Sequence, residues 1–275
     1  MAKPKLALIP AAQGSKLYSV LPSSGVGDFN FTRGSAATRV NKDGLIETVA
    51  SGVSRLNYPM IDGVVKGCPH HILEPHRTQR VQYSEDFSQS YWNVNLATIT
   101  PNNAISPDGT LNADLLNYTN SSGALTSSVY SGSSIVKTTV SLFVKISTSN
   151  LFNLGMSDGV NEGFYYTFNL KTQNANINAT PSYFTTPSFE IKNYGNGWFR
   201  LSVSAVSTIN GQIIIYSPSV SGLTANYYIW GAQLEQGSYA TSYIPNYGTF
   251  GGVTRSAETA NGSGDAATFN DSEGV

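Results

Sequence analysis

The stretch Val140-Ser-Leu-Phe-Val-Lys-Ile146 decides the fold class, because its side chains alternate strictly in character. In a β-strand, successive side chains point to opposite faces. The four branched residues from Val140 to Ile146 therefore share one face, and Ser141, Phe143 and Lys145 share the other. This period of two predicts a strand that buries at least one face.

Neighbouring segments repeat the pattern. Residues 163–171 alternate aromatic with polar side chains, and 189–194 and 198–203 flank Gly195-Asn-Gly197, a sequence that tolerates the positive φ angles of a tight hairpin turn. Residues 212–216 and 227–235 are further strand candidates. Successive strands without intervening helices predict an all-β fold, an antiparallel jelly-roll β-sandwich over residues 81–248.

The composition agrees with this class. The chain has 275 residues, only 12% of them charged, a net charge of −1 and 16 tyrosines. Soluble domains average about 25% charged residues, and aromatic and hydroxyl-bearing residues favour strands over helices. These values exclude a coiled coil and a basic nucleic-acid binder, and no apolar run approaches the roughly 20 residues that would insert into a membrane.

The flanking regions differ from the centre. Residues 1–80 carry ten Lys and Arg against five Asp and Glu, with few large apolar side chains. They predict an extended, irregular N-terminal arm that becomes ordered against other subunits. The alternative is a small irregular domain packed on the sandwich. Residues 249–275 are acidic and rich in Gly and Ser, which predicts a linker towards a further C-terminal domain.

Motifs for catalysis are scarce. The Gly-x-Ser-x-Gly elbow is absent, and all three histidines lie before residue 81, away from the predicted sandwich. A glycan-degrading enzyme needs a suitably spaced pair of carboxylates. Eight acidic residues lie within 81–248, but nothing in their spacing selects a pair. We therefore expect the protein not to be an enzyme.

Two groups of residues raise the question of a metal. The only cysteine, Cys68, lies within nine residues of His70, His71 and His76. Adjacent histidines in an extended chain point apart, which is awkward for tetrahedral coordination, so a segment that contacts a partner is the favoured reading. A metal shared across a threefold axis is the alternative.

Calcium is the second possibility. Asp108, Asn112 and Asp114 crowd one segment, although Pro107-Asp-Gly109 favours a plain turn there. Asp86, near the first strand of the sandwich, and Glu235, near the last, would hold a structural calcium if the two ends meet. No other cofactor is expected.

A glycan site is predicted from aromatic residues on the second face of the strands. Phe143, Tyr165 and Trp198 share their faces with polar and basic side chains, among them Arg200. A flat ring complements the C–H face of a sugar, and a guanidinium complements its hydroxyls. The alternative is that both faces of the sandwich bury aromatics as ordinary packing.

Several short motifs, taken in order, resemble a module of tailed-bacteriophage fibre proteins. They are Phe31-Thr-Arg-Gly-Ser-Ala-Ala-Thr-Arg-Val-Asn41 with Gly44-Leu-Ile-Glu47, Ile72-Leu-Glu-Pro-His-Arg-Thr78, Tyr83-Ser-Glu-Asp-Phe87 with Tyr91-Trp92, Ile105-Ser-Pro-Asp-Gly-Thr-Leu-Asn-Ala-Asp114, Gly197-Trp-Phe-Arg-Leu201, Trp230-Gly-Ala-Gln-Leu-Glu-Gln-Gly237 and Thr241-Ser-Tyr-Ile-Pro245. The resemblance covers roughly residues 28–260.

This resemblance implies a structural virion protein, a head or tail fibre whose carbohydrate-binding-module-like jelly roll projects from the particle and serves host attachment. Residues 1–80 would attach it to capsid, portal or tail proteins, and the expected state is a homotrimer on the phage surface. A host surface glycan is a further expected partner, and a glycan-binding module is the alternative function. The family supplies no catalytic residues.

Overall fold

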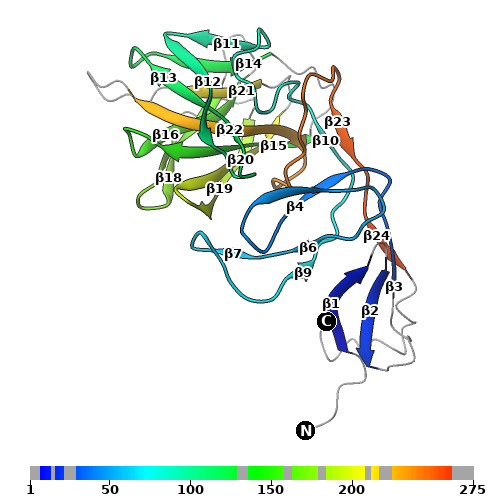
Figure 1. The fold of residues 1–275 in the computed structure, drawn as a ribbon. Coiled ribbons are helices and arrows are strands. Elements are labelled where there is room, and N and C mark those ends of the chain that lie inside the picture. Colours follow the sequence, from blue (N-terminus) through cyan, green and yellow to red (C-terminus); the bar gives the residue numbers. More distant parts are fainter. Residues whose placement is uncertain are drawn as a thin grey trace. The chain divides into compact units, whose positions relative to one another are not determined.

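The structure, a computed structural model, describes residues 7–13, 16–21, 29–128, 136–157, 163–178, 184–207, 212–216 and 225–261. The chain divides into two compact units. Unit 1 comprises Met1–Pro59, Val65–Arg77 and Thr254–Val275, and unit 2 comprises Met60–Val64 and Thr78–Val253. Within the described ranges every regular element is a β-strand (Figure 1).

Unit 2 is built from two six-stranded sheets whose neighbouring strands are all antiparallel. Sheet I has the order β11 (Trp92–Asn95), β14 (Ala124–Ser127), β21 (Gln212–Tyr216), β16 (Leu151–Ser157), β17 (Gly163–Asn169) and β18 (Asn174–Asn178). Sheet II has the order β12 (Ala97–Ile105), β13 (Leu111–Tyr118), β22 (Asn226–Gln236), β15 (Val136–Ile146), β20 (Trp198–Ser207) and β19 (Phe184–Gly195).

The alternating side chains bury one face of each sheet in a shared core. In β17, burial alternates as the sequence predicts, with Phe164, Tyr166 and Phe168 buried between half-buried neighbours. Leu142 of β15 and Leu201 of β20 are fully buried in the same cluster. The two sheets therefore pack face to face, with their apolar faces buried between them. The all-β class and the antiparallel sandwich are confirmed.

The predicted hairpin is also confirmed. Strands β19 and β20 pair from Phe184 opposite Ser207 to Gly195 opposite Trp198. The turn has positive φ angles of 78° at Gly195, 52° at Asn196 and 82° at Gly197. Glycine and asparagine adopt these angles at little cost, which explains why the chain reverses there.

Unit 1 consists of short strands joined by long connections. A four-stranded sheet has the order β1 (Ala7–Gln13), β2 (Lys16–Leu21), β3 (Phe29–Thr32) and β24 (Thr259–Asn261). Two further pairs are β4 (Ala37–Val40) with β5 (Ile46–Val49), and β6 (Leu56–Asn57) with β9 (His70–His71). Of the remaining strands, β7 (Met60–Ile61) belongs to unit 2, whereas β8 (Val64–Val65), β10 (Arg77–Gln79) and β23 (Val253–Arg255) have residues in both units.

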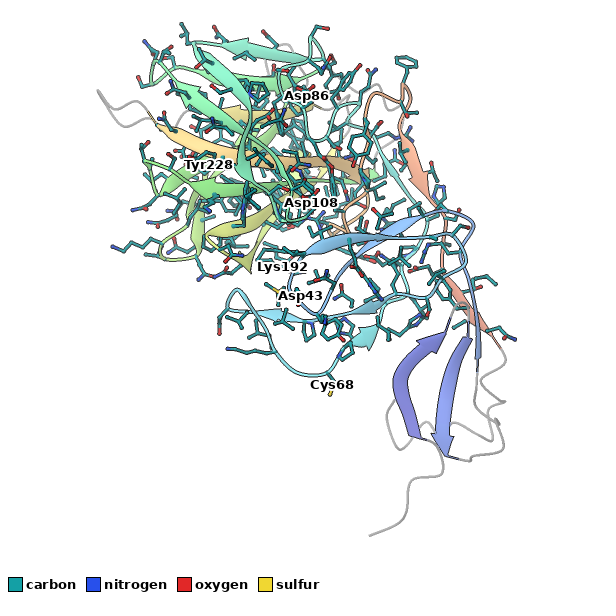
Figure 2. The ribbon with its side chains drawn as sticks, viewed as in Figure 1. Asp43, Cys68, Asp86, Asp108, Lys192 and Tyr228 are labelled. Carbon is teal, nitrogen blue, oxygen red and sulfur yellow. The ribbon has the colours of Figure 1, made fainter. Side chains whose placement is uncertain are left out.

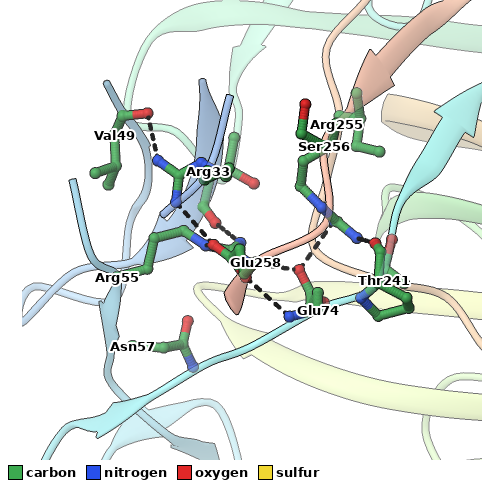
Figure 3. Close-up of polar contacts among 12 residues, drawn as sticks. Arg33, Val49, Arg55, Asn57, Glu74, Thr241, Arg255, Ser256 and Glu258 are labelled. Atoms are coloured by element: carbon green, nitrogen blue, oxygen red, sulfur yellow. Dashed lines mark hydrogen bonds and ion pairs between the residues drawn. The ribbon is translucent and has the colours of Figure 1, made fainter. Parts of the chain in front are cut away.

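A buried cluster of charged residues ties unit 1 together (Figure 3). Glu258 accepts hydrogen bonds from Arg33 (2.7 Å), from Arg55 (2.7 and 2.5 Å) and from the Glu74 backbone amide (2.8 Å). Glu74 also pairs with Arg55 and Arg255. The side chains of Arg33, Arg55 and Glu258 are fully buried. Burial would raise the pKa of Glu258, but the hydrogen bonds and charge of Arg55, then of Arg33, outweigh it and hold that pKa below its ordinary value.

The cluster shows that residues from both flanking regions are buried together in unit 1. Within a single chain, Phe31, Val40 and Arg55 are at most 7% exposed, so burying these side chains requires no other subunit. Residues 253–261 form β23 and β24 and contribute Glu258 to unit 1, which differs from the linker expected there. The buried arginines attract the carboxylate of Glu258. The Gly- and Ser-rich composition of residues 249–275 gives no sign of this ion pair. The rest of the expected linker, residues 262–275, lies outside the described residues.

Candidate functional site

The residues predicted to bind a glycan do not form an exposed surface. Phe143 is 0% exposed, Trp198 3% and Arg200 6%, so the expectation that they face outward is wrong. A side chain this buried has no ring face free to stack on a sugar. Tyr165 is half-buried and lies on β17 of sheet I, whereas the other three lie on sheet II.

These three residues form a second packed layer on the outer face of sheet II. The Phe143 ring packs edge-on against Tyr194, Trp230 and Tyr243, and the guanidinium carbon of Arg200 lies 5.2 Å from its centroid. The expectation failed because a chain segment covers this face, which alternation alone cannot reveal. The alternative reading, ordinary packing on both faces, describes Phe143, Trp198 and Arg200.

Polar side chains of β22 hold the covering segment in place. Glu235 accepts hydrogen bonds from the Thr241 amide (2.9 Å) and hydroxyl (2.7 Å), and Gln233 accepts one from the Ile244 amide (2.8 Å). Arg200 donates to the Thr241 carbonyl (2.7 Å). The motif residues of 230–237 and 241–245 are therefore the two halves of one clamp.

A bulge in β22 makes room for the clamp. The pairing with β15 shifts between Ser141 and Phe143, and Gly231 has a φ of 65° at that place. A Cβ on Gly231 would lie 2.9 Å from the Phe143 ring. Glycine is required here by both its angle and its neighbour, and the shift turns Trp230 and Gln233 to the same outer face.

The structure does not bring Asp86 and Glu235 together in one site. Both oxygens of Glu235 are engaged by Thr241 and Gln233, and Asp86 accepts hydrogen bonds from Ser88 and Gln89. In the described part of the chain, no group of three or more His, Cys, Asp or Glu residues could hold a metal ion.

Cys68 and the histidines likewise form no metal-binding group among the described residues. Cys68 is exposed on the connection between β8 and β9 (Figure 2). His71 packs edge-on against Phe31, with ring centroids 5.2 Å apart, and burial lowers the pKa of its imidazole. The imidazole of His71 therefore serves as a packing element in unit 1.

Unit 2 contains a pocket with a volume of about 320 Å³. Its wall comes from three segments: the chain before β11, the β12–β13 hairpin and the loop after the clamp. The lining residues are Tyr83, Glu85, Asp86, Gln89, Pro101, Asn102, Asn112, Asp114, Asn246 and Tyr247. Three are carboxylates, and none of the ten is a lysine, arginine or histidine. We call this site the acidic pocket.

Glu85 is fixed in the wall by neutral donors. Its Oε1 accepts hydrogen bonds from the hydroxyls of Tyr243 (2.8 Å) and Tyr247 (3.1 Å), and its Oε2 from Asn112 (2.9 Å). Burial raises the pKa of the Glu85 carboxyl above its ordinary value, although the two tyrosine hydrogen bonds oppose the rise. The clamp that carries Tyr243 thus also positions Glu85.

Asp114 is held by the backbone. Its two oxygens accept hydrogen bonds from the amides of Asn102 (2.9 Å) and Phe87 (2.8 Å). Burial raises its pKa to about 6 despite both bonds. Asn102 has a positive φ of 52° in an irregular part of the β12–β13 ladder, and that irregularity turns its amide toward Asp114.

The wall of the pocket includes an exposed aromatic ring and one buried acceptor without a partner. Tyr247 is 72% exposed, although its hydroxyl is held by Glu85. The Oδ1 atom of Asn112 is buried without a hydrogen-bond partner. Asp86 belongs to this wall, and hydrogen bonds from Gln89 and Ser88 outweigh burial and lower the pKa of its carboxyl (Figure 2).

Sequence reasoning located parts of this pocket but not its composition. The sequence grouped Asn112 and Asp114 with Asp108, and separately paired Asp86 with Glu235 for calcium. In the structure Asp86, Asn112 and Asp114 line one pocket, and Glu235 does not. The turn at Asp108 is as expected, since Asp108 accepts from the Thr110 amide at 2.8 Å. Tyr247 was missed, although it follows the motif 241–245 by two residues.

Comparisons with known proteins give little guidance. Neither a protein-family model nor a curated protein matches the chain at a significant level. One similar solved structure holds the N-terminal CBM22-1–GH10 modules of an endo-1,4-β-D-xylanase from Clostridium thermocellum, complexed with xylohexaose. It is 16% identical, with a TM-score of 0.32, over 62% of this chain and 30% of that one. A likeness this weak assigns no family. Among the described residues, no helix is long and apolar enough to cross a membrane.

Proposed function

We propose that unit 2 is a carbohydrate-binding domain that holds a sugar in the acidic pocket without cleaving it. The observation that carries this proposal is the combination of a pocket of about 320 Å³, an exposed Tyr247 ring and a wall of carboxylate and amide groups. A sugar offers an apolar C–H face to the ring and hydroxyls to the polar wall. The volume lies within the range of small-molecule pockets.

The carboxylates of the pocket are suited to holding hydroxyls. Asp114 is fixed by two backbone amides, and Glu85 by two tyrosines and Asn112. Such fixed acceptors lose little conformational freedom when a ligand binds. Cleavage would need one carboxyl to release a proton to the glycosidic oxygen, and the raised pKa values of Glu85 and Asp114 would also suit that role. An assay for new reducing ends therefore tests the proposal of recognition against cleavage.

A glycan array probed with the whole chain tests the proposal. Tyr247→Ala should abolish the binding of any oligosaccharide found, with a loss of at least about tenfold. Tyr239→Ala is the matched control, because Tyr239 is 48% exposed and does not line the pocket. Tyr165→Ala tests the remaining residue of the predicted surface. A blank array, or binding that depends on Tyr165 and ignores Tyr247, would refute a site in the acidic pocket.

We also propose that the chain is a fibre component of a phage particle, a trimer attached through residues 1–80 and displaying unit 2 for host attachment. The ordered succession of motifs supports this role. Several motif residues, Arg33, Glu74 and Gln233 among them, have structural tasks in the two units, as expected for a scaffold that many fibres could share.

Light scattering and particle incorporation test the fibre role. The purified chain should have the mass of three copies. Removing residues 1–28 keeps every residue of the buried arginine–glutamate cluster but also removes β1 and β2, and β2 pairs with β3. A loss of incorporation reports attachment only when hydrogen exchange in β4 and β5 is unchanged by the deletion. A monomeric mass together with unchanged incorporation would contradict the proposal.

A further inference from the structure

We infer that the sugar taken by the acidic pocket carries a free primary amine, so that the pocket selects amino sugars over their N-acetylated, neutral and acidic counterparts. The inference rests on the proposed function and narrows its ligand class. It follows from the charge of the wall, from the surplus of hydrogen-bond acceptors and from the shape of the opening.

Charge excludes acidic sugars. Glu85, Asp86 and Asp114 line the pocket, and no lining residue is basic. Asp108 adds a fourth carboxylate close by, since it shares Asn112 with Glu85 at 3.3 and 2.9 Å. A uronate or sulfate would meet like charge with no cation to offset it, whereas an ammonium group would be attracted.

The unused hydrogen-bond acceptors of the pocket favour a ligand that is rich in donors. Each carboxylate oxygen accepts about two hydrogen bonds. After the bonds already made, one position stays open on Asp86 and two on Asp114, which is 1% exposed at the inner wall of the pocket. The Asn112 Oδ1 atom has no partner at all.

The donors of the pocket are largely engaged already. The Tyr247 hydroxyl bonds Glu85, the Asn112 amide group bonds Glu85 and Asp108, and the Asn246 amide group bonds two backbone carbonyls. An ammonium group has three donors and no acceptor, which matches this imbalance. An N-acetyl group replaces those donors with one N–H and adds a carbonyl that needs a donor. Acetylation should therefore weaken binding.

The opening adds a place for the sugar ring. Tyr247 and Tyr83 both line the pocket, their backbones pair as an isolated bridge, and Tyr247 is 72% exposed. An aromatic face attracts cations as well as sugar C–H groups. The ring can therefore hold the sugar while the amine points toward Asp86 and Asp114.

Calorimetry with four probes tests the inference at about pH 7 and low salt, between the pKa of Asp114, about 6, and that of an amine, about 8. The probes are hexamers of glucosamine, N-acetylglucosamine, glucose and galacturonate. The glucosamine hexamer should bind at least about tenfold more tightly than the other three. Asp86→Asn should weaken its binding about tenfold and change the affinity for the glucose hexamer less than twofold. Glu190→Gln is the matched control, since it removes one exposed negative charge outside the pocket.

The outcomes separate the inference from the proposed function. If N-acetylglucosamine or glucose hexamers bind as tightly as glucosamine and still need Tyr247, the site stands and the amine inference is overturned. If galacturonate binds best, the inference is overturned as well. If Glu190→Gln weakens the binding of glucosamine as much as Asp86→Asn does, the attraction is a general charge effect and the inference fails. If no oligosaccharide binds in calorimetry or on the array, the proposed function itself fails.

Discussion

Replacing Glu258 with alanine should loosen unit 1, because it leaves two arginines buried without their counter-charge. The Glu258 side chain is fully buried and accepts four hydrogen bonds, three from Arg33 and Arg55 and one from the Glu74 amide. Removing one partner of a buried ion pair costs about 3–5 kcal/mol. Glu74 compensates in part, since it also pairs with Arg55, at 2.8 Å. We therefore expect a loss of about 3 kcal/mol, at the lower end.

Hydrogen exchange is the suitable assay, since all three tryptophans, Trp92, Trp198 and Trp230, lie in unit 2 and their fluorescence reports that unit. A loss of about 3 kcal/mol corresponds to exchange roughly a hundredfold faster for the most protected amides of β4 and β5. Glu258→Gln keeps the shape and an acceptor, so its effect should be smaller.

Glu47→Ala serves as the control within the same unit. Glu47 pairs with Arg39 at 2.6 Å, but the two side chains are 37% and 28% exposed. Partly exposed pairs contribute at most about 1 kcal/mol. If Glu258→Ala changed exchange in β4 and β5 no more than Glu47→Ala does, the segment 254–261 would not stabilise unit 1 as described.

Three further predictions concern unit 2. The Asp114 pKa is raised from 3.8 to about 6, so the folded chain binds that proton more tightly than the unfolded chain. The free energy of unfolding should therefore fall by up to about 3 kcal/mol as pH rises from about 4 to about 6. In urea unfolding, Asp114→Asn should lack this decline, and a pH dependence equal to that of the unchanged protein would contradict the burial of an ionisable group there. Gly231→Ala should lower the free energy of unfolding by about 2–4 kcal/mol, because the new Cβ would clash with Phe143 in addition to the cost of a positive φ. Gly251→Ala, at a φ of 80° with open space around it, should cost only about 1–2 kcal/mol. Equal losses for the two variants in thermal unfolding would show that the clash with Phe143 contributes nothing. Trp198→Ala should cost about 3–5 kcal/mol through the lost buried ring and its 3.1 Å bond to the Ile105 carbonyl, and a stable variant that lost only sugar binding would restore Trp198 to the binding surface.

The alternation of side chains predicts the sandwich well because burial of one face is a local, periodic property. Residues 163–169 and the hairpin around Asn196 formed as predicted, since the period of two and the turn chemistry act over a few residues. The all-β class therefore follows from short stretches of sequence.

The second face could not be predicted in the same way. Phe143 is covered by Tyr243 of the segment 237–246, and the indole of Trp198 bonds the Ile105 carbonyl of β12. Both are contacts between distant segments of the chain. The polar character of Ser141 and Arg200 suggested solvent, yet Arg200 bonds the Ser141 hydroxyl at 3.0 Å and the Thr241 carbonyl beneath the clamp. Polar side chains that satisfy one another can be buried, so their presence on a strand does not mark a surface.

The pocket was only half visible for the same reason. Asp86 was expected to pair with Glu235 near the last strand, and Asp114 was grouped only with its sequence neighbours Asp108 and Asn112. The bond from the Phe87 amide to Asp114 joins residues 27 positions apart, and Tyr243 and Tyr247 reach Glu85 from about 160 positions away. Contacts over such distances in sequence cannot be predicted from residue spacing, because they depend on how loops pack on sheet II.

The most direct test of the central claim is to map backbone amide shifts in the NMR spectrum while adding the oligosaccharide that binds best on the array. Our account predicts that the largest shifts fall on Asn102, Asn112 and Tyr247 around the acidic pocket. Shifts concentrated on β17 and β18 around Tyr165, with the pocket amides unmoved, would contradict it.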